Sequence, residues 1–181
     1  MILTILLSFL AIAAADFDYH GRPKFLDVLK FYPPGIVTYL VKRTYKVKFT
    51  GEEPWCLYNK VGKVRGNTLE IEQGYSNRTQ NVRYQVRVVV SVDPSTDQAP
   101  SMSAVRENDP KQNREYNFHF YDPVAQCAVI TFKDYSGTWR CELHTWKDKA
   151  HYKYYKSCED EYDYQCPGRE SHSVYLYYCP E

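Results

Sequence analysis

The chain has 181 residues, with 23 basic and 22 acidic side chains and a formal net charge of +1. This balance of charge gives no reason to expect nucleic acid or an anionic membrane as a partner, and the length suits one domain. Eighteen tyrosines against two methionines supply stiff apolar rings with hydroxyl tips, which suit a β fold and a ligand-lining surface equally.

Residues 1–15 (MILTILLSFLAIAAA) form an apolar run that ends in small residues. This pattern is typical of a secretory signal peptide cut after Ala15, although no Lys or Arg precedes the run; the alternative is a buried N-terminal strand. The run is too short to span a bilayer, and no later segment is apolar enough to do so. We therefore expect residues 16–181 to form a single domain, secreted and extracellular, with no membrane partner.

The N-terminal part of the mature chain predicts a short helix followed by a strand. Residues 23–30 (PKFLDVLK) gather apolar side chains on one side and are stopped by Pro33 and Pro34. Residues 36–49 alternate between apolar and polar, which indicates a strand. Its apolar face carries one cation, Arg43, among Val37, Tyr39, Val41, Tyr45 and Val47.

Five further segments are predicted strands at short, regular spacing: 55–61, 68–73, 81–92, 101–107 and 114–121. The clearest is 81–92, where valines and one tyrosine occupy every second position opposite Arg83, Gln85 and Arg87. In the last of the five, we expect Tyr116, Phe118 and Phe120 to point inward.

Residues 121–146 predict a hairpin with one cysteine in each strand. The second strand sets Trp139, Cys141, Leu143 and Thr145 on one face against Arg140, Glu142, His144 and Trp146 on the other. Such an ionisable face usually points to water in an antiparallel sheet, but in a small closed barrel it can line the cavity. Which face is inside therefore decides the function.

Eight antiparallel strands joined by polar turns predict a mainly β fold, either an up-and-down barrel or a sandwich. After Trp146 the pattern predicts a C-terminal helix that Ser157 caps and Gly168 ends. Cys158, Tyr162 and Cys166 lie on one face of this helix, which would attach it to the barrel wall. Residues 174–179 are expected to cross the wall as an extended tail.

All six cysteines follow the predicted signal peptide, and an even number in an exported chain indicates three disulfides with 15 possible pairings. They are Cys56, Cys127, Cys141, Cys158, Cys166 and Cys179. No Cys or His spacing suggests a metal site, and we expect no cofactor. The sequon Asn77-Arg78-Thr79 predicts N-glycosylation at Asn77.

Several motifs, in this order and spacing, resemble the tick salivary lipocalins of the histamine-binding protein family. They are a signal with a short helix, VTYLVKRTYK at 37–46, DPVAQCAVITF at 122–132, CELHTW at 141–146 and a cysteine near the C-terminus. The resemblance implies an eight-stranded antiparallel lipocalin barrel with a short N-terminal helix and a C-terminal helix packed on it. It also implies the pairs Cys56–Cys179, Cys127–Cys158 and Cys141–Cys166, secretion in saliva, and capture of host histamine, serotonin or lipid mediators.

Amine-binding members of that family carry Cys-Asp-aliphatic, then Glu-Leu-Trp or Glu-Leu-Tyr, then Cys. This sequence has the same spacing, as Cys127-Ala128-Val129, Glu142-Leu143-His144 and Cys158. Glu142 therefore carries over as a candidate ligand residue, whereas Ala128 replaces the aspartate and His144 the aromatic. A further acidic residue expected after Thr44-Tyr45 is replaced by Val47-Lys48.

These departures set two ligand classes against each other. An ammonium ligand in a dry pocket needs carboxylates to offset its lost hydration, and aromatic faces add about 0.5 to 2 kcal/mol each. Arg43, Arg140 and His144 share the inward phase, so a neutral to positive pocket that suits a carboxylate ligand is the rival. For Glu142 itself, a salt bridge to one of the two arginines is the structural alternative.

The family resemblance makes a biogenic amine the leading ligand and a fatty acid or leukotriene the alternative. A scavenger that binds host proteins through its loops is a third possibility. No nucleophile or phosphate loop accompanies Glu142 and His144, so we expect no enzyme. We expect a monomer whose partner is a small-molecule host mediator, without nucleic acid. The predicted ligand-binding residues are Glu142, Tyr39, Tyr45, Arg43, Phe118, Phe120, Arg140, His144 and Trp146.

Overall fold

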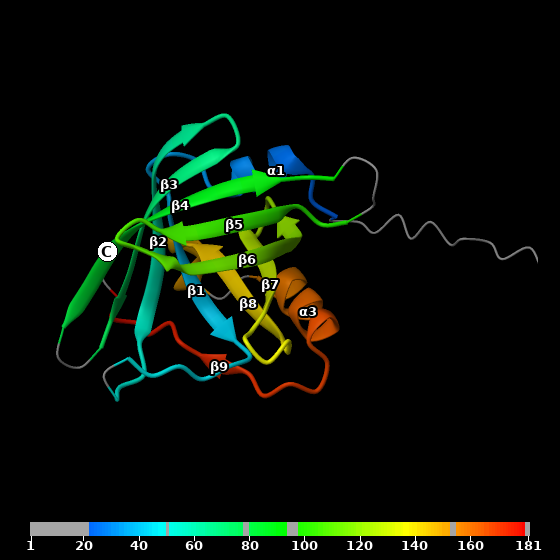
Figure 1. Cartoon of the computed structure of the whole chain (residues 1–181). Helices are drawn as coiled ribbons and strands as arrows, with labels where there is room; N and C mark the ends of the chain where they lie inside the picture. The colour runs from blue at the N-terminus through cyan, green and yellow to red at the C-terminus, as the bar shows by residue number, and fades with distance from the viewer. Residues whose placement is uncertain (1–21, 50, 78–79, 94–97, 153–154, 180–181) are drawn as a thin grey trace, which may run out of the picture.

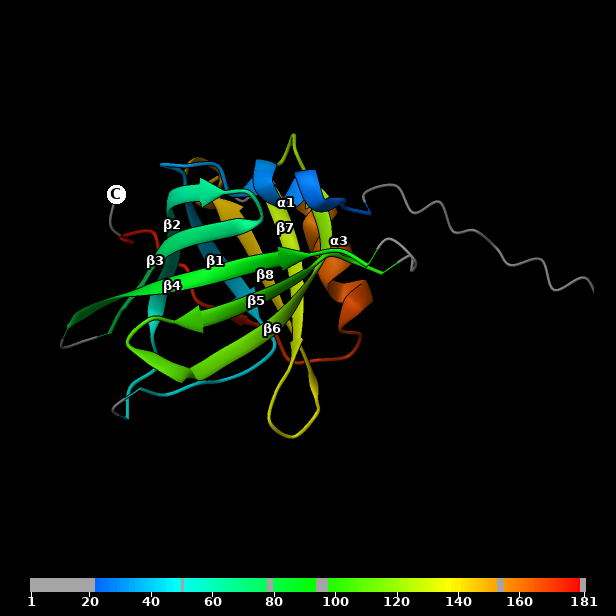
Figure 2. The same ribbon diagram turned by 45° about the horizontal axis from the view of Figure 1, so that its top comes forward.

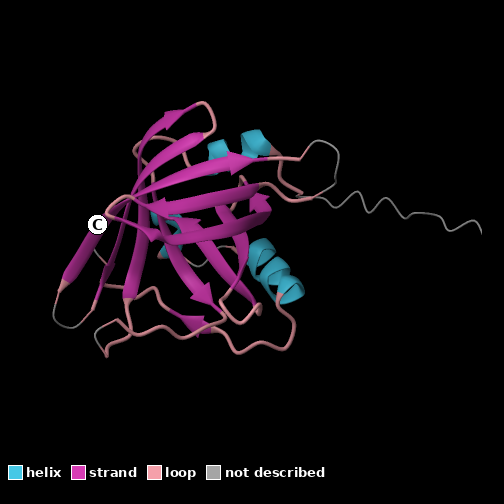
Figure 3. Ribbon diagram, viewed as in Figure 1, coloured by secondary structure: helices cyan, strands magenta, loops and turns pink. Residues whose placement is uncertain are grey.

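The computed structural model describes residues 22–49, 51–77, 80–93, 98–152 and 155–179, so the predicted signal peptide lies outside the described residues. Eight strands dominate the described chain (Figures 1 and 3). They are β1 (Val37–Arg43), β2 (Trp55–Arg65), β3 (Thr68–Ser76), β4 (Asn81–Ser91), β5 (Ser101–Arg106), β6 (Asp109–Asp122), β7 (Cys127–Lys133) and β8 (Trp139–Trp146). In this part of the chain, no helix is both long and apolar enough to cross a bilayer.

The strands form one closed antiparallel barrel. From β2 to β8 each strand pairs with the next along the chain, and β1 pairs with both β8 and β2. Figure 2 shows the strands wrapping around a common centre. The prediction of an eight-stranded, mainly β barrel is confirmed, and the alternative of a sandwich is excluded. The alternating valines of β4 lie inside this barrel, with Val86, Val88 and Val90 buried.

Several strands begin or end at other residues than the alternation of apolar and polar side chains predicts. β1 ends at Arg43 rather than continuing to Phe49, whereas β2 continues to Arg65 and pairs with β3 up to the tight turn at Gly66. Gly66 adopts a φ of 60°, which costs glycine little and favours such a hairpin turn. β6 likewise starts earlier, at Asp109, because it pairs with β5 through a polar segment.

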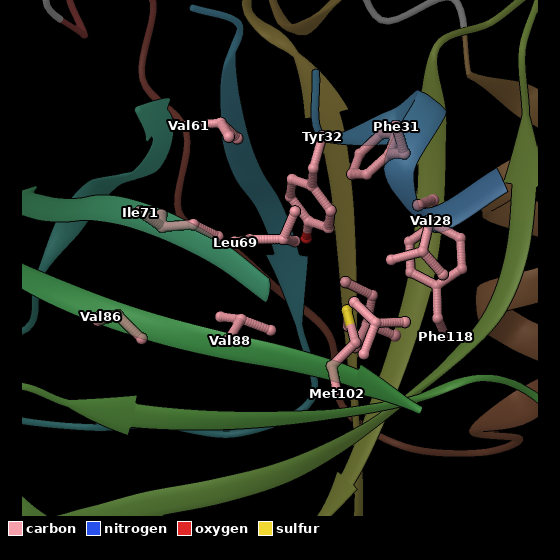
Figure 4. Close-up of a cluster of buried hydrophobic side chains, with 13 residues drawn as sticks. Val28, Phe31, Tyr32, Val61, Leu69, Ile71, Val86, Val88, Met102 and Phe118 are labelled. Atoms are coloured by element: carbon pink, nitrogen blue, oxygen red, sulfur yellow. The ribbon is translucent and has the colours of Figure 1, made fainter. Parts of the chain in front are cut away.

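One end of the barrel is closed by helix α1 (Phe25–Phe31). The side chain of Asp27 accepts a hydrogen bond from the backbone N–H of Lys24, which caps the first turn. Val28 and Phe31 are fully buried among apolar side chains of the barrel interior, including Leu69, Val88 and Phe118 (Figure 4). The closed end is therefore a packed core, and open space in the barrel is confined to the rest of its length.

Helix α3 (Lys156–Gln165) packs outside the barrel against β7 and β8, and the short α2 (Lys147–Ala150) links it to β8. The disulfides Cys127–Cys158 and Cys141–Cys166 join α3 and its end to these two strands. The predicted cap is wrong, because Tyr155 takes the N-cap position. Ser157 lies inside the first turn and donates a hydrogen bond to Asp122 at 2.5 Å instead.

The C-terminal tail completes the barrel wall. β1 and β2 pair over only three residues at the start of β1. At the end of β1, the short strand β9 (His172–Ser173) pairs with it instead. Val174 donates its backbone N–H to Val41 and accepts one from Cys56, so it bridges β1 and β2. Cys56–Cys179 holds the tail there. The three disulfides are the pairs that the family resemblance implies.

A close approach between β2 and β3 leads to a stability prediction. A Cβ on Gly74 would lie 2.4 Å from the ring of Tyr58. That ring cannot move freely, because its hydroxyl donates to Glu72 at 3.1 Å and it packs against Tyr39. Gly74→Ala is therefore expected to lower the free energy of unfolding by about 1 to 3 kcal/mol in urea denaturation. Gly62→Ala is the control, since its nearest atom would be 3.4 Å away; an equal loss there would contradict this explanation.

Candidate functional site

The open part of the barrel contains a chamber with a volume of about 420 Å³. A small deeper space of about 50 Å³ continues below it toward the packed end. Side chains that line both spaces form a belt between them: Asn59, Gln73, Val86, Ala104, Tyr116, Glu142 and His144. The chamber above the belt carries the arginines, whereas the deeper space is mainly apolar.

Strand β8 directs its ionisable face into the barrel. Glu142 and His144 line the chamber and are each only 5% exposed, while the alternate residues Cys141 and Leu143 belong to the cluster on the outer wall. Trp146 continues the inner face but lies at the closed end, where its Nε1–H donates to the backbone oxygen of Phe31 at 2.9 Å. Of the two orientations that the sequence leaves open, the charged face is inside.

Glu142 is held as an anion by two hydrogen bonds. The Tyr45 hydroxyl donates to its Oε1, and Nε2 of His144 lies 2.8 Å from its Oε2. Burial alone would raise the pKa of Glu142, but the hydrogen bonds and charge of His144, the bond from Tyr45 and the nearby charge of Arg114 together lower this pKa below its ordinary value. The chamber therefore contains one buried, fixed carboxylate.

A β-bulge in β1 separates residues that the sequence placed on one face. The register of β1 against β8 shifts between Leu40 and Lys42, and a one-residue shift turns the following side chains to the other face. Arg43 and Tyr45 thus line the chamber, whereas Tyr39 packs outside against Tyr175 with ring centroids 5.1 Å apart. The predicted inward placement of Tyr39 is wrong for this reason.

Arg43 is the most deeply buried charge of the chamber wall. Its side chain is 0% exposed, its Nη2 donates to Glu53 at 3.0 Å, and its guanidinium lies 5.2 Å from the ring centre of Tyr45. Nε and Nη1 have no hydrogen-bond partner among the described residues. Buried donors of this kind are costly unless water or a ligand satisfies them.

A second bulge, in β6, changes which aromatic side chains of this strand point into the barrel. The register against β7 shifts between Phe118 and Phe120. Phe118 points inward but is fully buried in the closed end, 5.7 Å from the ring centre of Phe31. Phe120 packs on the outer wall beside the disulfides, so its predicted inward placement is wrong. The tyrosine rings that line the chamber include Tyr45, Tyr84 and Tyr116.

Arg140 does not belong to the chamber lining of the described residues. It lies at the start of β8, where its guanidinium forms an ion pair with Asp134 in the β7–β8 turn at 2.6 Å. The prediction that it adds positive charge to the pocket is wrong, because the turn supplies a counter-ion outside the chamber. The salt bridge between Glu142 and Arg140 that the sequence leaves open is absent as well.

Two arginines that the sequence reasoning missed line the chamber instead. Arg106 lies 4.0 Å from the ring centre of Tyr84, and Arg114 lies 4.1 Å from that of Phe132. Nε of Arg106 is buried without a hydrogen-bond partner among the described residues. The signal was available for Arg114, which lies two residues before the inward-facing Tyr116.

Charge in the chamber is therefore positive in balance. Three guanidinium groups face one carboxylate, and that carboxylate already accepts hydrogen bonds from Tyr45 and His144. Glu53 offsets part of this charge at Arg43. Buried donors without a partner on Arg43 and Arg106 add to the capacity of the site to bind an acceptor-rich anion. No cluster of three or more metal-ligating side chains occurs among the described residues.

The predicted glycosylation site, Asn77, lies at the start of the turn between β3 and β4. Asn77 is 7% exposed, and its Oδ1 accepts a hydrogen bond from the backbone of Gln80 at 2.9 Å. Arg78 and Thr79 of the sequon lie outside the described residues. Glycosylation stays a prediction.

The lowered pKa of Glu142 predicts how stability depends on pH. A carboxyl whose pKa is lower in the folded than in the unfolded state contributes stability above its unfolded pKa, and this contribution is lost as the pH falls through the folded value. We expect unfolding temperature to decline below about pH 4.5, with part of the decline due to Glu142. Thermal unfolding between pH 7 and pH 3 should show a shallower decline for Glu142→Gln; parallel curves would contradict this.

The chain is similar in sequence to one protein family and in fold to several solved structures. The family model described as tick histamine binding protein matches residues 35–181. No curated protein matches the chain in sequence. The solved structure of AM182 in complex with serotonin is 18% identical, with a TM-score of 0.62, over 90% of this chain and 96% of that chain. Japanin from Rhipicephalus appendiculatus bound to cholesterol is 12% identical, with a TM-score of 0.54, over 79% and 93%.

At these identities the two solved structures show the shared lipocalin fold alone, whereas the family model covers most of the chain. The family is named for histamine binding, and the two solved structures are of complexes with serotonin and with cholesterol. The chain belongs to the tick histamine-binding protein family.

Proposed function

We propose that this chain is a secreted salivary protein that sequesters one small host mediator in its chamber without catalysis, and that the mediator carries a carboxylate. A volume of about 420 Å³ lies in the range of pockets that enclose drug-sized ligands. The deeper, mainly apolar space suits a hydrocarbon or aromatic body. A lipid mediator of the fatty acid or leukotriene type combines these features.

The single observation that carries this proposal is Arg43. Its guanidinium is fully buried, lines the chamber and keeps two donors without a partner among the described residues. A carboxylate that accepts from one of these donors forms a charge-assisted hydrogen bond, which is strong when water is excluded. An ammonium ligand would instead enter a chamber in which three arginines repel it.

A biogenic amine, histamine or serotonin, is the second candidate, and Glu142 is the observation that favours it. This carboxylate is buried, remains ionised, and lies beside the rings of Tyr45 and Tyr116, which suits a cation. The family name and the serotonin complex of AM182 point the same way. The arginines weigh against this candidate because they lower the affinity of the chamber for any cation.

Isothermal titration of the mature protein separates the two candidates. We expect saturable binding of dodecanoic acid or leukotriene B4 at one site per chain, and affinities for histamine and serotonin at least about tenfold weaker. Raising the salt concentration should change the affinity little, because a buried ion pair is screened less than an exposed one. Binding of the amines with no binding of the acids would overturn the carboxylate proposal and leave the amine as the ligand class.

A further inference from the structure

Arg106 is the cation of the chamber that has no acidic partner in the described parts of the chain. Arg43 is paired with Glu53 at 3.0 Å, and the charge of Glu142 acts on Arg114. For Arg106, no ion pair is formed with any residue that the structure describes, and its buried Nε has no hydrogen-bond partner there. A carboxylate bound at Arg43 would leave this second cation without a counter-ion.

The ring of Tyr84 holds the Arg106 side chain against the chamber wall. Arg106 pairs with Val86 across β4 and β5, and its guanidinium lies 4.0 Å from the centre of the Tyr84 ring. A cation over an aromatic face is attracted to it, which restricts the orientation of the guanidinium, but the ring carries no net charge. The cation is therefore held in position without being neutralised.

Arg106 and Arg43 lie on opposite walls at the open end of the barrel. They are the last residues of β5 and β1, and these strands are four places apart in either direction around the closed sheet. Four antiparallel steps make the two strands run the same way, so both arginines reach the same end. Each guanidinium lies over a ring of its own wall, Tyr84 on one side and Tyr45 on the other. This arrangement suits two separate anionic groups better than one.

We propose that Arg106, held by Tyr84, is a second anion-binding subsite opposite Arg43, and that the ligand carries two acidic groups joined by a body that crosses the chamber. The ligand class is then a diacid rather than a plain fatty acid. This inference rests on the proposed function, because Arg43 binds the first acidic group.

The sign of one comparison distinguishes such a subsite from an apolar wall. Against an apolar wall, a second carboxylate on the ligand loses its hydration without compensation and weakens binding. Beside Arg106, the same group gains a charge-assisted hydrogen bond and supplies the missing counter-ion, so it strengthens binding. A monomethyl ester of the diacid keeps the length and the oxygen atoms but lacks the second charge, and it should gain neither.

The test is a titration of the wild-type protein with α,ω-diacids of six, eight, ten and twelve carbons, each beside its monomethyl ester and the plain acid of the same length. At one length we expect the diacid to bind about ten to a hundred times more tightly than the ester and the plain acid. That length reports the separation of the two subsites. The comparison uses the unaltered protein, so it does not depend on the folding of a variant.

Arg106→Gln should reduce the ratio of diacid to plain-acid affinity to within about threefold of unity. Arg87→Gln is the matched control, because Arg87 is exposed on the outer face of the neighbouring strand β4, and it should keep the wild-type ratio. Circular dichroism establishes that both variants are folded. A diacid preference that persists in folded Arg106→Gln would overturn the assignment to this residue.

Two further outcomes separate the inference from the proposed function. Plain acids that bind as tightly as the diacids at every length would overturn the second subsite and leave the proposed function intact. Failure of the plain acids and the diacids alike to bind would overturn both.

Discussion

Arg43→Gln is expected to lower the affinity for dodecanoic acid by at least about thirtyfold. Truncating one partner of a buried, hydrogen-bonded charge pair costs about 2 to 5 kcal/mol, and Arg43 is the fully buried cation of the chamber. The same variant should bind histamine as tightly as the wild type or more tightly, because it removes a cation. Titration of both ligands against both proteins measures the two changes.

Arg140→Gln is the matched control for this experiment. Arg140 lies at the barrel edge but pairs with Asp134 outside the chamber, so its removal should change the acid affinity by less than about threefold. Circular dichroism establishes that both variants are folded. An unchanged acid affinity in folded Arg43→Gln would show that the carboxylate does not bind at this arginine.

Glu53→Gln refines the role of Arg43. Glu53 is the counter-ion of Arg43, and it lies on the loop before β2 with about half of its side chain exposed, at 46%. A ligand carboxylate competes with Glu53 for the same guanidinium. The variant should therefore raise the acid affinity and lower the stability of the ligand-free protein, a pairing of effects that thermal unfolding with and without dodecanoic acid measures.

Removal of the Cys56–Cys179 disulfide is expected to cause the largest loss of stability. The bond closes a sequence separation of 123 residues, and the chain-entropy relation gives about 5 kcal/mol for a loop of that length. For a chain of this size we expect Cys56→Ser/Cys179→Ser to unfold about 10 to 20 °C lower. Ligand affinity should fall too, because Val174 of the tail bridges β1 and β2 beside Arg43.

Cys127→Ser/Cys158→Ser provides the comparison, since this bond closes a separation of 31 residues, for which the same relation gives about 3.7 kcal/mol. It attaches α3 to the outer wall and does not touch the gap between β1 and β2. We expect it to lower the unfolding temperature less and to leave the ligand affinity nearly unchanged. Equal effects of the two double variants on affinity would contradict a role of the tail in supporting the chamber.

Local patterns were sufficient to predict eight antiparallel strands, and the family resemblance selected the barrel over the sandwich. Alternation with a period of two is a property of consecutive residues, so the eight strands, the inward valines of β4 and the ionisable face of β8 follow from the sequence. The short helix α1 follows from its apolar spacing and the prolines after it. The six cysteines predict three disulfides, and only the family resemblance selected among 15 pairings.

The sequence by itself thus determined the fold class, the strand order along the chain and the common face of Glu142 and His144, whereas the structure decided that this face lies inside. Only the tertiary structure decided which other side chains reach the chamber. The bulges in β1 and β6 arise from pairing with distant strands and turn Tyr39 and Phe120 outward while Arg43 turns inward. Counter-ions are also non-local: Asp134 pairs with Arg140 outside the chamber, and closure of the barrel brings Arg106 and Arg114 into the same chamber as Glu142.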